Sequence, residues 1–219
     1  DDALGFYTPI LKGFLTEMGL EAAQLGMQVM GGHGYIREHG MEQIVRDARI
    51  ATLYEGTTGI QALDLLGRKV LLGSRGRCVR EFTTTMRQLA MPHVASRGAL
   101  GRMARTLLRG SLQWNVLTWR LMLKARQDRD QVGSASVDYL MYCGYWMMAH
   151  YWVLQAVRAD AVLRQGQAAE RADFYTAKLQ TAEFYVERLL PRAQAHAKAA
   201  LASPRTLMQT PNDHLGLSA

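Results

Sequence analysis

Apolar residues in the first third of the chain recur every three or four positions, and glycines interrupt them. This spacing predicts amphipathic helices, and a glycine at the end of a run predicts where a helix stops. Gly19 is expected to interrupt the first run and Gly31 to Gly34 to end it. Thr57 is a good N-cap for the last run. The predicted helices are Tyr7 to Met18, Leu20 to Met30, Met41 to Ile50 and Thr57 to Leu72.

A second pattern begins after Gly73-Ser74-Arg75-Gly76, where longer apolar runs are separated by proline or glycine. Because these residues end helices, the runs predict an antiparallel helical bundle. Its expected helices are Cys78 to Met91, Val94 to Arg126, Ser136 to Arg164 and Ala169 to Leu190, with a last one reaching Leu201. A break near Gly110 is an open alternative. The predicted division is residues 1–73, an appended bundle at 74–202 and an irregular tail at 203–219.

The composition favours an all-α fold. Of the 219 residues, 48% are hydrophobic and only five are proline, and few runs alternate as strands require. Residues 137–157 are apolar almost all round, but Asp138, His150 and Gln155 interrupt them and their Tyr and Trp residues lie throughout. The aromatic residues of a membrane span gather at its ends, so we interpret this stretch as the central helix of the bundle. The two cysteines lie far apart in sequence, which predicts a reduced, cytoplasmic setting.

Positive charge is concentrated between Arg68 and Arg129. Fourteen Lys and Arg residues stand there against two acids, a local charge of +12 in a chain whose net charge is +7. A solvated or acid-paired helix face and an anion-binding surface both fit this basic block. Arg102, Arg105 and Arg109 share one helical stripe, which favours acids or cofactor phosphates as their partners. Only two of the fourteen are lysines, so a nucleic-acid groove is not expected.

The segment Tyr54-Glu55-Gly56-Thr57-Thr58 places a carboxylate directly before a helix N-terminus. Glycine lets the backbone approach a ligand and Thr57 caps the next turn, so Glu55 should be fixed in position. An acid favoured by the positive end of a helix would also explain Glu55, without any chemistry. The residue types alone leave both interpretations open.

Two further segments carry candidate contacts. In Gln28-Val29-Met30-Gly31-Gly32-His33-Gly34-Tyr35 the glycines follow a helix instead of a strand, so the segment is not a dinucleotide fingerprint. A helix C-cap and a flat backbone patch for a cofactor are both compatible with it. Taken alone, Arg46-Asp47-Ala48-Arg49 would be a surface ion pair. The six histidines form no metal-binding pattern, so no metal site is predicted.

Together these three segments resemble the acyl-CoA dehydrogenase family. The C-terminal helical domain of that family carries Gln-x-x-Gly-Gly-x-Gly-Tyr/Phe, then Arg-Asp-Ala-Arg/Lys-Ile, then Tyr-Glu-Gly-Thr. This chain has them in the same order at Gln28 to Tyr35, Arg46 to Ile50 and Tyr54 to Thr57. The second half is similar to the branch with an added C-terminal helical domain, the methylthiopropanoyl-CoA dehydrogenase-like proteins. The similarity there rests on Asp138-Tyr139-Leu140, Phe174-Tyr175, Phe184-Tyr185 and Pro191.

The resemblance implies that Glu55 is the catalytic base of an FAD-dependent enzyme that desaturates an acyl-CoA to its 2-enoyl-CoA. It implies that Gln28, Gly31 and Gly32 lie against the ADP part of an FAD bound mainly by a neighbouring subunit. Thr57 would touch the same flavin. An electron-transfer flavoprotein as acceptor and a homo-oligomeric assembly are further implications.

Some expectations limit this interpretation. The family's N-terminal helical domain and middle β-domain have no counterpart here, so we expect the chain to be a fragment that is colourless and inactive by itself. Gly59 stands where many relatives have Gln, which removes one expected cofactor contact. Two other classes stay open: a basic nucleic-acid-binding relative of the family and a non-catalytic assembly module. The length of the acyl chain is not predicted, because residues that would floor its pocket lie largely outside this chain.

Overall fold

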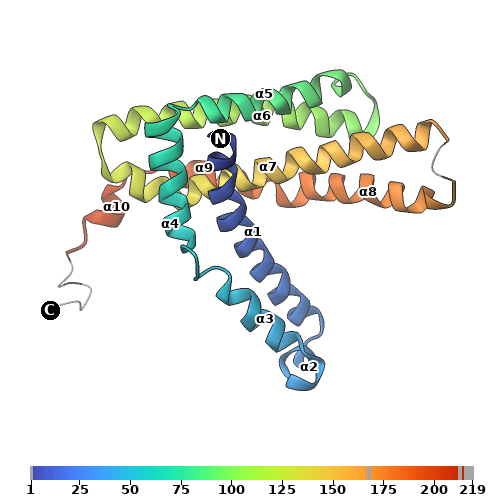
Figure 1. Ribbon diagram of the computed structural model, residues 1–219, viewed down its shortest axis with the longest axis horizontal. Coiled ribbons are helices and arrows are strands. Elements are labelled where there is room, and N and C mark those ends of the chain that lie inside the picture. Colours follow the sequence, from blue (N-terminus) through green and yellow to red (C-terminus); the bar gives the residue numbers. More distant parts are fainter. Residues whose placement is uncertain (1, 167–168, 212–213, 215–219) are drawn as a thin grey trace.

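The chain is mostly helical in the part that the computed structural model describes, residues 2–166, 169–211 and 214, and none of these residues forms a strand. The prediction of an all-α fold is confirmed. An arm, formed by the C-terminal half of α1 with α2 and α3, projects from a bundle of long helices (Figure 1). The helices are α1 (Asp2–Val29), α2 (Gly32–Tyr35), α3 (Met41–Ile50), α4 (Thr58–Leu63), α5 (Arg77–Ala90), α6 (Gly98–Gln127), α7 (Asp130–Arg164), α8 (Ala172–Phe184), α9 (Arg192–Ala200) and α10 (Arg205–Met208).

Short 3-10 and π-helical segments join several of these helices. The 3-10 turns are η1 (Arg37–His39), η3 (Met91–His93) and η4 (Ala169–Arg171). Two segments are π-helical and continue a preceding helix: η2 (Asp64–Gly73) extends α4, and η5 (Tyr185–Leu189) extends α8. The predicted helix from Thr57 to Leu72 is thus an α-helix that widens into a π-helix over its second half.

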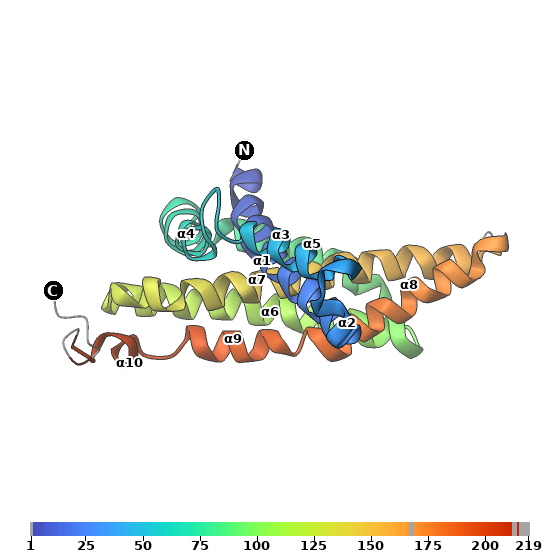
Figure 2. The ribbon, with the colours of Figure 1, turned by 90° about the horizontal axis from the view of Figure 1, so that it is seen from below.

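The bundle places α7 at its centre. α5 packs on α6, α6 on α7, and α7 on both α8 and α9, which follow one another along its length (Figures 1 and 2). Buried residues therefore occur on all sides of α7, among them Tyr139, Cys143 and Trp146. This central position explains the continuous apolar stretch predicted to be a bundle helix. Within the described ranges no helix is long and apolar enough to cross a membrane.

α1 is a single continuous helix of 28 residues, so the predicted interruption at Gly19 is wrong. Gly19 is exposed, and apart from its own helix no described residue places a heavy atom within 4 Å of the position that its Cβ would take. A glycine inside a helix costs only about 1 kcal/mol relative to alanine. Burial of Phe6, Ile10 and Phe14, one turn apart on the same face, offsets that cost.

α6 is also continuous, and the alternative of a break at Gly110 is wrong. The glycine serves packing instead, because the indole ring of Trp146 on α7 fills the space beside it. A Cβ on Gly110 would lie 2.0 Å from Trp146 Cζ3. Glycine at this position lets α6 and α7 approach closely, which no larger residue would allow.

Several details of the second half also differ from the prediction. α6 begins at Gly98, four residues after the predicted Val94. α7 begins at Asp130, six residues before the predicted Ser136, where Asp128 Oδ1 accepts a hydrogen bond from the Asp130 N–H at 3.0 Å. The tail predicted to be irregular contains the short helix α10 after Pro204. Residues 212–213 and 215–219 of that tail lie outside the described residues.

α1 crosses α7 where two glycines let the helices interlock. The ring of Phe14 fills the space beside Gly144, so a Cβ there would lie 2.1 Å from the ring. On α1, the position of a Cβ at Gly13 lies 2.7 Å from Leu140 Cδ1. Phe14 also meets Tyr145 edge to face, with ring centroids 5.0 Å apart. The crossing fixes the base of the arm on the bundle.

The two kinds of glycine should respond oppositely to alanine. Gly144→Ala should lower the free energy of unfolding by about 1–3 kcal/mol, because the new methyl group collides with Phe14. Gly19→Ala should raise it by about 1 kcal/mol, because only helix propensity changes there. Urea denaturation followed by circular dichroism measures both. Equal effects at the two positions would contradict the assignment of Gly144 to the crossing.

Candidate functional site

Glu55 lies in the connector between α3 and α4, residues 51–57, and has a strained backbone. Its φ of 56° is in the left-handed region, and Gly56 follows with a φ of 91°. A residue with a side chain pays about 1–3 kcal/mol for such a conformation, so surrounding contacts must impose it. The carboxylate itself is exposed and has no hydrogen-bond or ion-pair partner within the described residues.

Contacts from α4 hold the strained turn in place. Gln61 Nε2 donates to the Glu55 carbonyl oxygen at 3.2 Å. Its amide also occupies the space beside Gly56, where a Cβ would lie 2.6 Å from Gln61 Nε2. Thr57 is the N-cap of α4 and accepts a hydrogen bond from the Ile60 N–H at 3.4 Å, so the predicted cap is confirmed.

Contacts from α1 hold the other side of the connector. Lys12 Nζ donates to the Ala51 carbonyl oxygen at 2.6 Å and lies 4.5 Å from the centre of the Tyr54 ring. Thr58 Oγ1 donates to Glu17 Oε1 at 2.5 Å. These long-range ties, like the role of Gln61, were not predicted from the sequence. They attach the connector to the same helix that crosses α7.

The Arg-Asp-Ala-Arg segment lies on α3 and supports the connector from a third direction. Arg49 Nη1 donates to Thr52 Oγ1 at 3.2 Å, and Thr52 is buried. Arg46 pairs with Glu42 at 2.7 Å, one turn earlier on α3, and its hydrogen bonds lower the pKa of the Glu42 carboxyl group. The segment therefore does contain a surface ion pair, whose acid lies outside the motif.

Gln28, Gly31 and Gly32 lie at the tip of the arm, where α1 ends and α2 begins. All three are exposed, and beyond the adjacent backbone no described residue places a heavy atom within 4 Å of a Cβ position on either glycine. Gly31 has φ 58° and ψ −142°, a conformation accessible essentially to glycine alone. Gly34 closes the turn under Met27, since a Cβ there would lie 2.5 Å from the Met27 carbonyl oxygen. The tip thus presents bare backbone to its surroundings.

The structure does not bring the tip and the connector together. α3 runs from the tip back toward the bundle, and its ten residues rise about 15 Å (Figure 1). Glu55 and Thr57 therefore lie at the base of the arm, while Gln28, Gly31 and Gly32 lie at its far end. A single bound molecule touching both groups would have to extend along the arm.

Gly59 lies in the first turn of α4 and is open to its surroundings. The nearest heavy atom to its Cβ position is Thr57 Oγ1, at 4.0 Å. A longer side chain would fit at this position. Glycine here consequently removes a contact without being required by packing.

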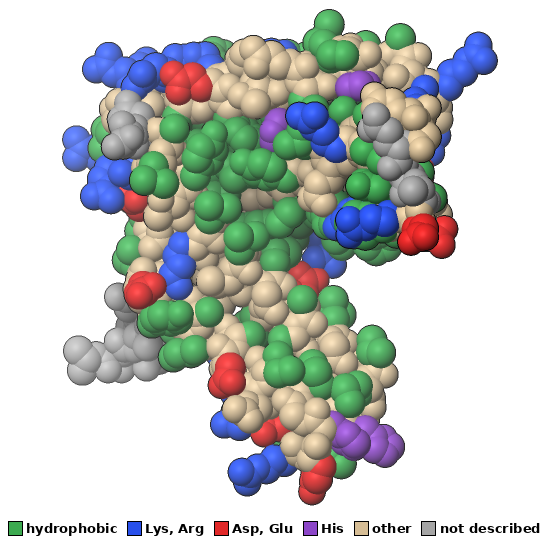
Figure 3. Space-filling view, turned by 45° about the vertical axis from the view of Figure 1, so that its right-hand side comes forward, with side chains coloured by type: hydrophobic (Ala, Val, Ile, Leu, Met, Phe, Trp, Pro, Cys, Tyr) green, Lys and Arg blue, Asp and Glu red, His purple; other side chains and the backbone are tan. Residues whose placement is uncertain are grey.

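The arm exposes large apolar side chains along its length. Val29 is 88% exposed and Tyr35 is 76% exposed. In the space-filling view, hydrophobic side chains gather on the projecting arm as well as on the bundle above it (Figure 3). Others on the arm and its base are Leu25, Ile36, Ile44, Ile50, Leu53, Tyr54 and Ile60. Apolar surface of this extent marks an interaction site.

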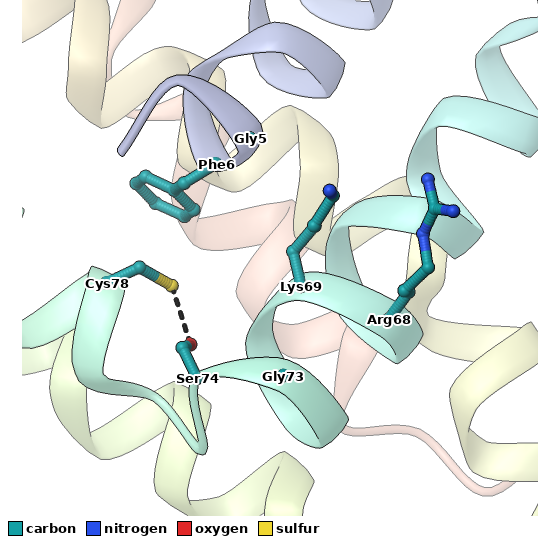
Figure 4. A pocket seen from close by; sticks show the side chains of 7 residues that line it. All are labelled: Gly5, Phe6, Arg68, Lys69, Gly73, Ser74 and Cys78. Carbon is teal, nitrogen blue, oxygen red and sulfur yellow. Dashed lines mark hydrogen bonds between the residues drawn. The ribbon is translucent and has the colours of Figure 1, made fainter. Parts of the chain in front are cut away.

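A cavity of about 260 Å³ lies between the start of α1 and the end of η2 (Figure 4). Lys69, Ser74 and Cys78 are among the residues that line it, and the Ser74 Oγ and Cys78 Sγ atoms lie 2.9 Å apart. Burial raises the pKa of the Cys78 thiol, which makes it a poor nucleophile near neutral pH. Among the described residues, no group of three or more His, Cys, Asp or Glu side chains could hold a metal ion.

The arginine stripe on α6 meets its predicted partners only in part. Arg102 forms an ion pair with Glu183 on α8 and lies 3.8 Å from Glu187. Arg105 instead donates to the Val94 carbonyl oxygen at 2.7 Å. Arg109 is exposed, with no hydrogen-bond or ion-pair partner in the described part of the chain. Acid pairing thus accounts for one of the three.

Gln61→Ala should loosen the connector without unfolding the protein. The lost hydrogen bond to the Glu55 carbonyl is worth about 1 kcal/mol, so amide exchange in residues 54–58 should accelerate about fivefold. Hydrogen exchange read by mass spectrometry measures this, with Gln43→Ala on the exposed face of α3 as control. Unchanged exchange in the connector would show that Gln61 does not hold the turn.

Two family models match the chain and together cover most of it. The model described as "Acyl-CoA dehydrogenase, C-terminal domain" matches residues 2–71. The model described as "Acetyl-CoA dehydrogenase C-terminal like" matches residues 79–211. The connector and the tip both lie in the first match, and the second match begins in the first turn of α5 and includes α6 to α10.

Curated relatives agree with these matches. The chain is 38% identical over 190 residues to 3-methylmercaptopropionyl-CoA dehydrogenase of Ruegeria pomeroyi, covering 87% of this chain and 32% of that protein. It is 32% identical over 193 residues to the broad-specificity linear acyl-CoA dehydrogenase FadE5 of Mycobacterium tuberculosis, covering 84% and 31%. Over 56 residues it is 38% identical to the caffeyl-CoA reductase-Etf complex subunit CarC of Acetobacterium woodii, covering 26% and 15%. The chain spans about a third of the length of the first two relatives.

These findings confirm the resemblance that the three motifs indicated, including its branch. Two successive C-terminal domain models and two relatives above 30% identity agree on one group of proteins. The chain therefore belongs to the acyl-CoA dehydrogenase family.

Proposed function

We propose that this chain supplies the catalytic base, Glu55, to an enzyme that also contains the family's other domains and that desaturates an acyl-CoA to its 2-enoyl-CoA. The observation that carries the proposal is the strained turn at Glu55. An acid that merely favoured a helix N-terminus would need no left-handed backbone. Contacts from α1 and α4 maintain this turn while the carboxylate stays exposed and unpartnered within the described residues.

The proposed chemistry needs a carboxylate held at a fixed place over the acyl chain. The α-proton of a thioester is weakly acidic, and misplacement of the base by an ångström is costly. In the proposed step the bond from Cα to hydrogen breaks and Glu55 takes the proton. The Glu55 backbone N–H would donate to the thioester oxygen, where negative charge develops, and such donors are typically worth about 3 kcal/mol.

The residues at the tip fit one edge of an FAD. Gly31 and Gly32 offer backbone without side chains and open space beside it, and Gln28 is an exposed amide next to them. When bound, FAD accepts the hydride from the β-carbon of the substrate. Because Thr57 lies at the base of the arm, its proposed flavin contact and the tip contacts require either an extended cofactor or two cofactors.

Further parts of the proposal concern assembly and partners. The exposed apolar side chains of the arm support a homo-oligomer in which neighbouring subunits cover them. The name of the caffeyl-CoA reductase-Etf complex subunit supports an electron-transfer flavoprotein as acceptor. Two buried free cysteines support a cytoplasmic setting. The matches to 2–71 and 79–211 support a division near residue 74 between the proposed units at 1–73 and 74–202, whereas the second match continues to residue 211, into the proposed tail at 203–219.

In the longer protein, Glu55→Gln should abolish turnover and leave FAD bound. The amide keeps the shape of the side chain but cannot take the proton, so kcat should fall about 10²- to 10⁴-fold with little change in KM. Exchange of the substrate α-proton with deuterated water should stop as well. Glu38→Gln, an exposed acid on the arm, is the control. Turnover at the parent level in Glu55→Gln would assign the base to another residue.

The 219-residue chain, purified alone, should be colourless and inactive. It offers only an edge of the proposed flavin site, so most of the binding energy would come from other domains. Visible absorbance spectroscopy after incubation with FAD and gel filtration checks this. A flavin band at a stoichiometry near one per chain would contradict it.

A further inference from the structure

A larger cavity, of about 610 Å³, lies where η2 crosses the end of the α6–α7 hairpin. The teal helix that contains η2 passes over this end of the hairpin in both ribbon views (Figures 1 and 2). The volume falls in the range of sites that hold small organic ligands. No residue of the 51–57 connector or of the arm's tip lines it.

The floor of this cavity is apolar. Leu71 and Leu72 come from η2, Met122 from α6 and Val132 from α7. Leu72 is 78% exposed, so it lies at the open edge of the cavity. Gly67 contributes no side chain, and among the described residues beyond its own helix and chain neighbours the atom nearest to its Cβ position is Val132 Cγ1, at 3.4 Å. The floor can therefore take an aliphatic chain.

The rim of the cavity is positively charged. Arg75, Arg126 and Arg129 line it, and no acid does among the residues that the structure describes. Within the described residues none of these three guanidinium groups has a hydrogen-bond or ion-pair partner, in contrast to Arg68 and Arg102, which pair with acids. The neighbouring acid Asp128 accepts a hydrogen bond from the Asp130 N–H. Three guanidinium groups beside an apolar floor suit a planar or tetrahedral anion that carries an aliphatic chain.

The loop that carries Arg75 is held in an unusual shape. Arg75 has a φ of 49°, and it and Glu55 are the two residues other than glycine with a positive φ in the described part of the chain. The Arg75 carbonyl oxygen accepts from Arg80 Nη1 at 3.3 Å, and the Gly76 N–H donates to the Val70 carbonyl oxygen at 2.8 Å. π-Helical segments and strained residues are both found often at functional sites. Here they place Arg75 at the rim.

We propose that this cavity binds an amphiphilic anion, a carboxylate or phosphate head group on an aliphatic chain. The head group lies among Arg75, Arg126 and Arg129, and the chain lies on Leu71, Leu72 and Met122. The site lies within the basic block, and the head group would pair with three of that block's arginines, Arg75, Arg126 and Arg129. It is separate from any role of Glu55 and does not depend on it.

The test is calorimetric titration of the 219-residue chain with four probes below their micelle concentrations. Octanoate and octyl phosphate should each bind at a single site, and the tighter of the two identifies the head group. Octanol, which lacks the charge, and inorganic phosphate, which lacks the chain, should bind at least about tenfold more weakly. Octanol as tight as octanoate, or inorganic phosphate as tight as octyl phosphate, would overturn the proposal.

Variants separate the two parts of the site. Arg126→Gln combined with Arg129→Gln should weaken octanoate about tenfold, whereas Arg97→Gln, at the other end of α6, should leave it unchanged. Gly67→Leu adds a side chain beside Val132 and should weaken octanoate without lowering the midpoint of thermal unfolding. Equal losses in the Arg97 control, or full binding in a folded Gly67→Leu protein, would show that octanoate binds elsewhere.

Discussion

The close crossing of α1 and α7 determines how the rest of the molecule is placed. At this point Phe14 occupies the space left by Gly144, and Leu140 occupies the space left by Gly13. Each helix thus supplies both a bulky group and a gap, so the two backbones cannot slide or separate without opening a void. The connector that carries Glu55 is attached to the same α1 through Lys12 and Glu17. Packing in the bundle therefore sets the position of an exposed carboxylate that the bundle does not itself contact.

Helix periodicity and capping residues were enough to predict much of this fold. The predicted helix from Met41 to Ile50 has those bounds in the structure, and Thr57 caps the helix after it. Glycines inside helices were harder to interpret, because their effect depends on residues far away in sequence. Gly110 faces Trp146, and Gly19 faces nothing, yet the local sequence around each suggests a break equally well. The π-helical course of residues 64–73 was not predicted either, because the apolar periodicity of the segment suits an ordinary α-helix as well.

The segments of the candidate site could be recognised in the sequence, but their geometry could not. Glu55, Gly56 and Thr57 were recognisable from their order, and the family that they indicate is confirmed. The left-handed backbone at Glu55 was not, because its supports come from Gln61 and from residues about forty positions earlier. The distance between the tip glycines and the connector was not predicted either. The two segments are close in sequence, but the rigid helix α3 lies between them and holds them apart. The order of the motifs indicated the family, whereas long-range contacts determine the geometry of the connector.

Because α1 is unbroken, a rotation of the helix about its crossing with α7 moves the whole arm. Gly13 lies at the crossing, and the sixteen residues from there to Val29 span about 24 Å of rigid helix. A rotation of α1 by about 5° at the crossing displaces Val29 by about 2 Å. Small changes in the packing of Phe14 on Gly144 therefore produce larger shifts in the positions of Gly31 and Gly32. Residues at the crossing that contact no ligand can in this way control the position of the tip of the arm.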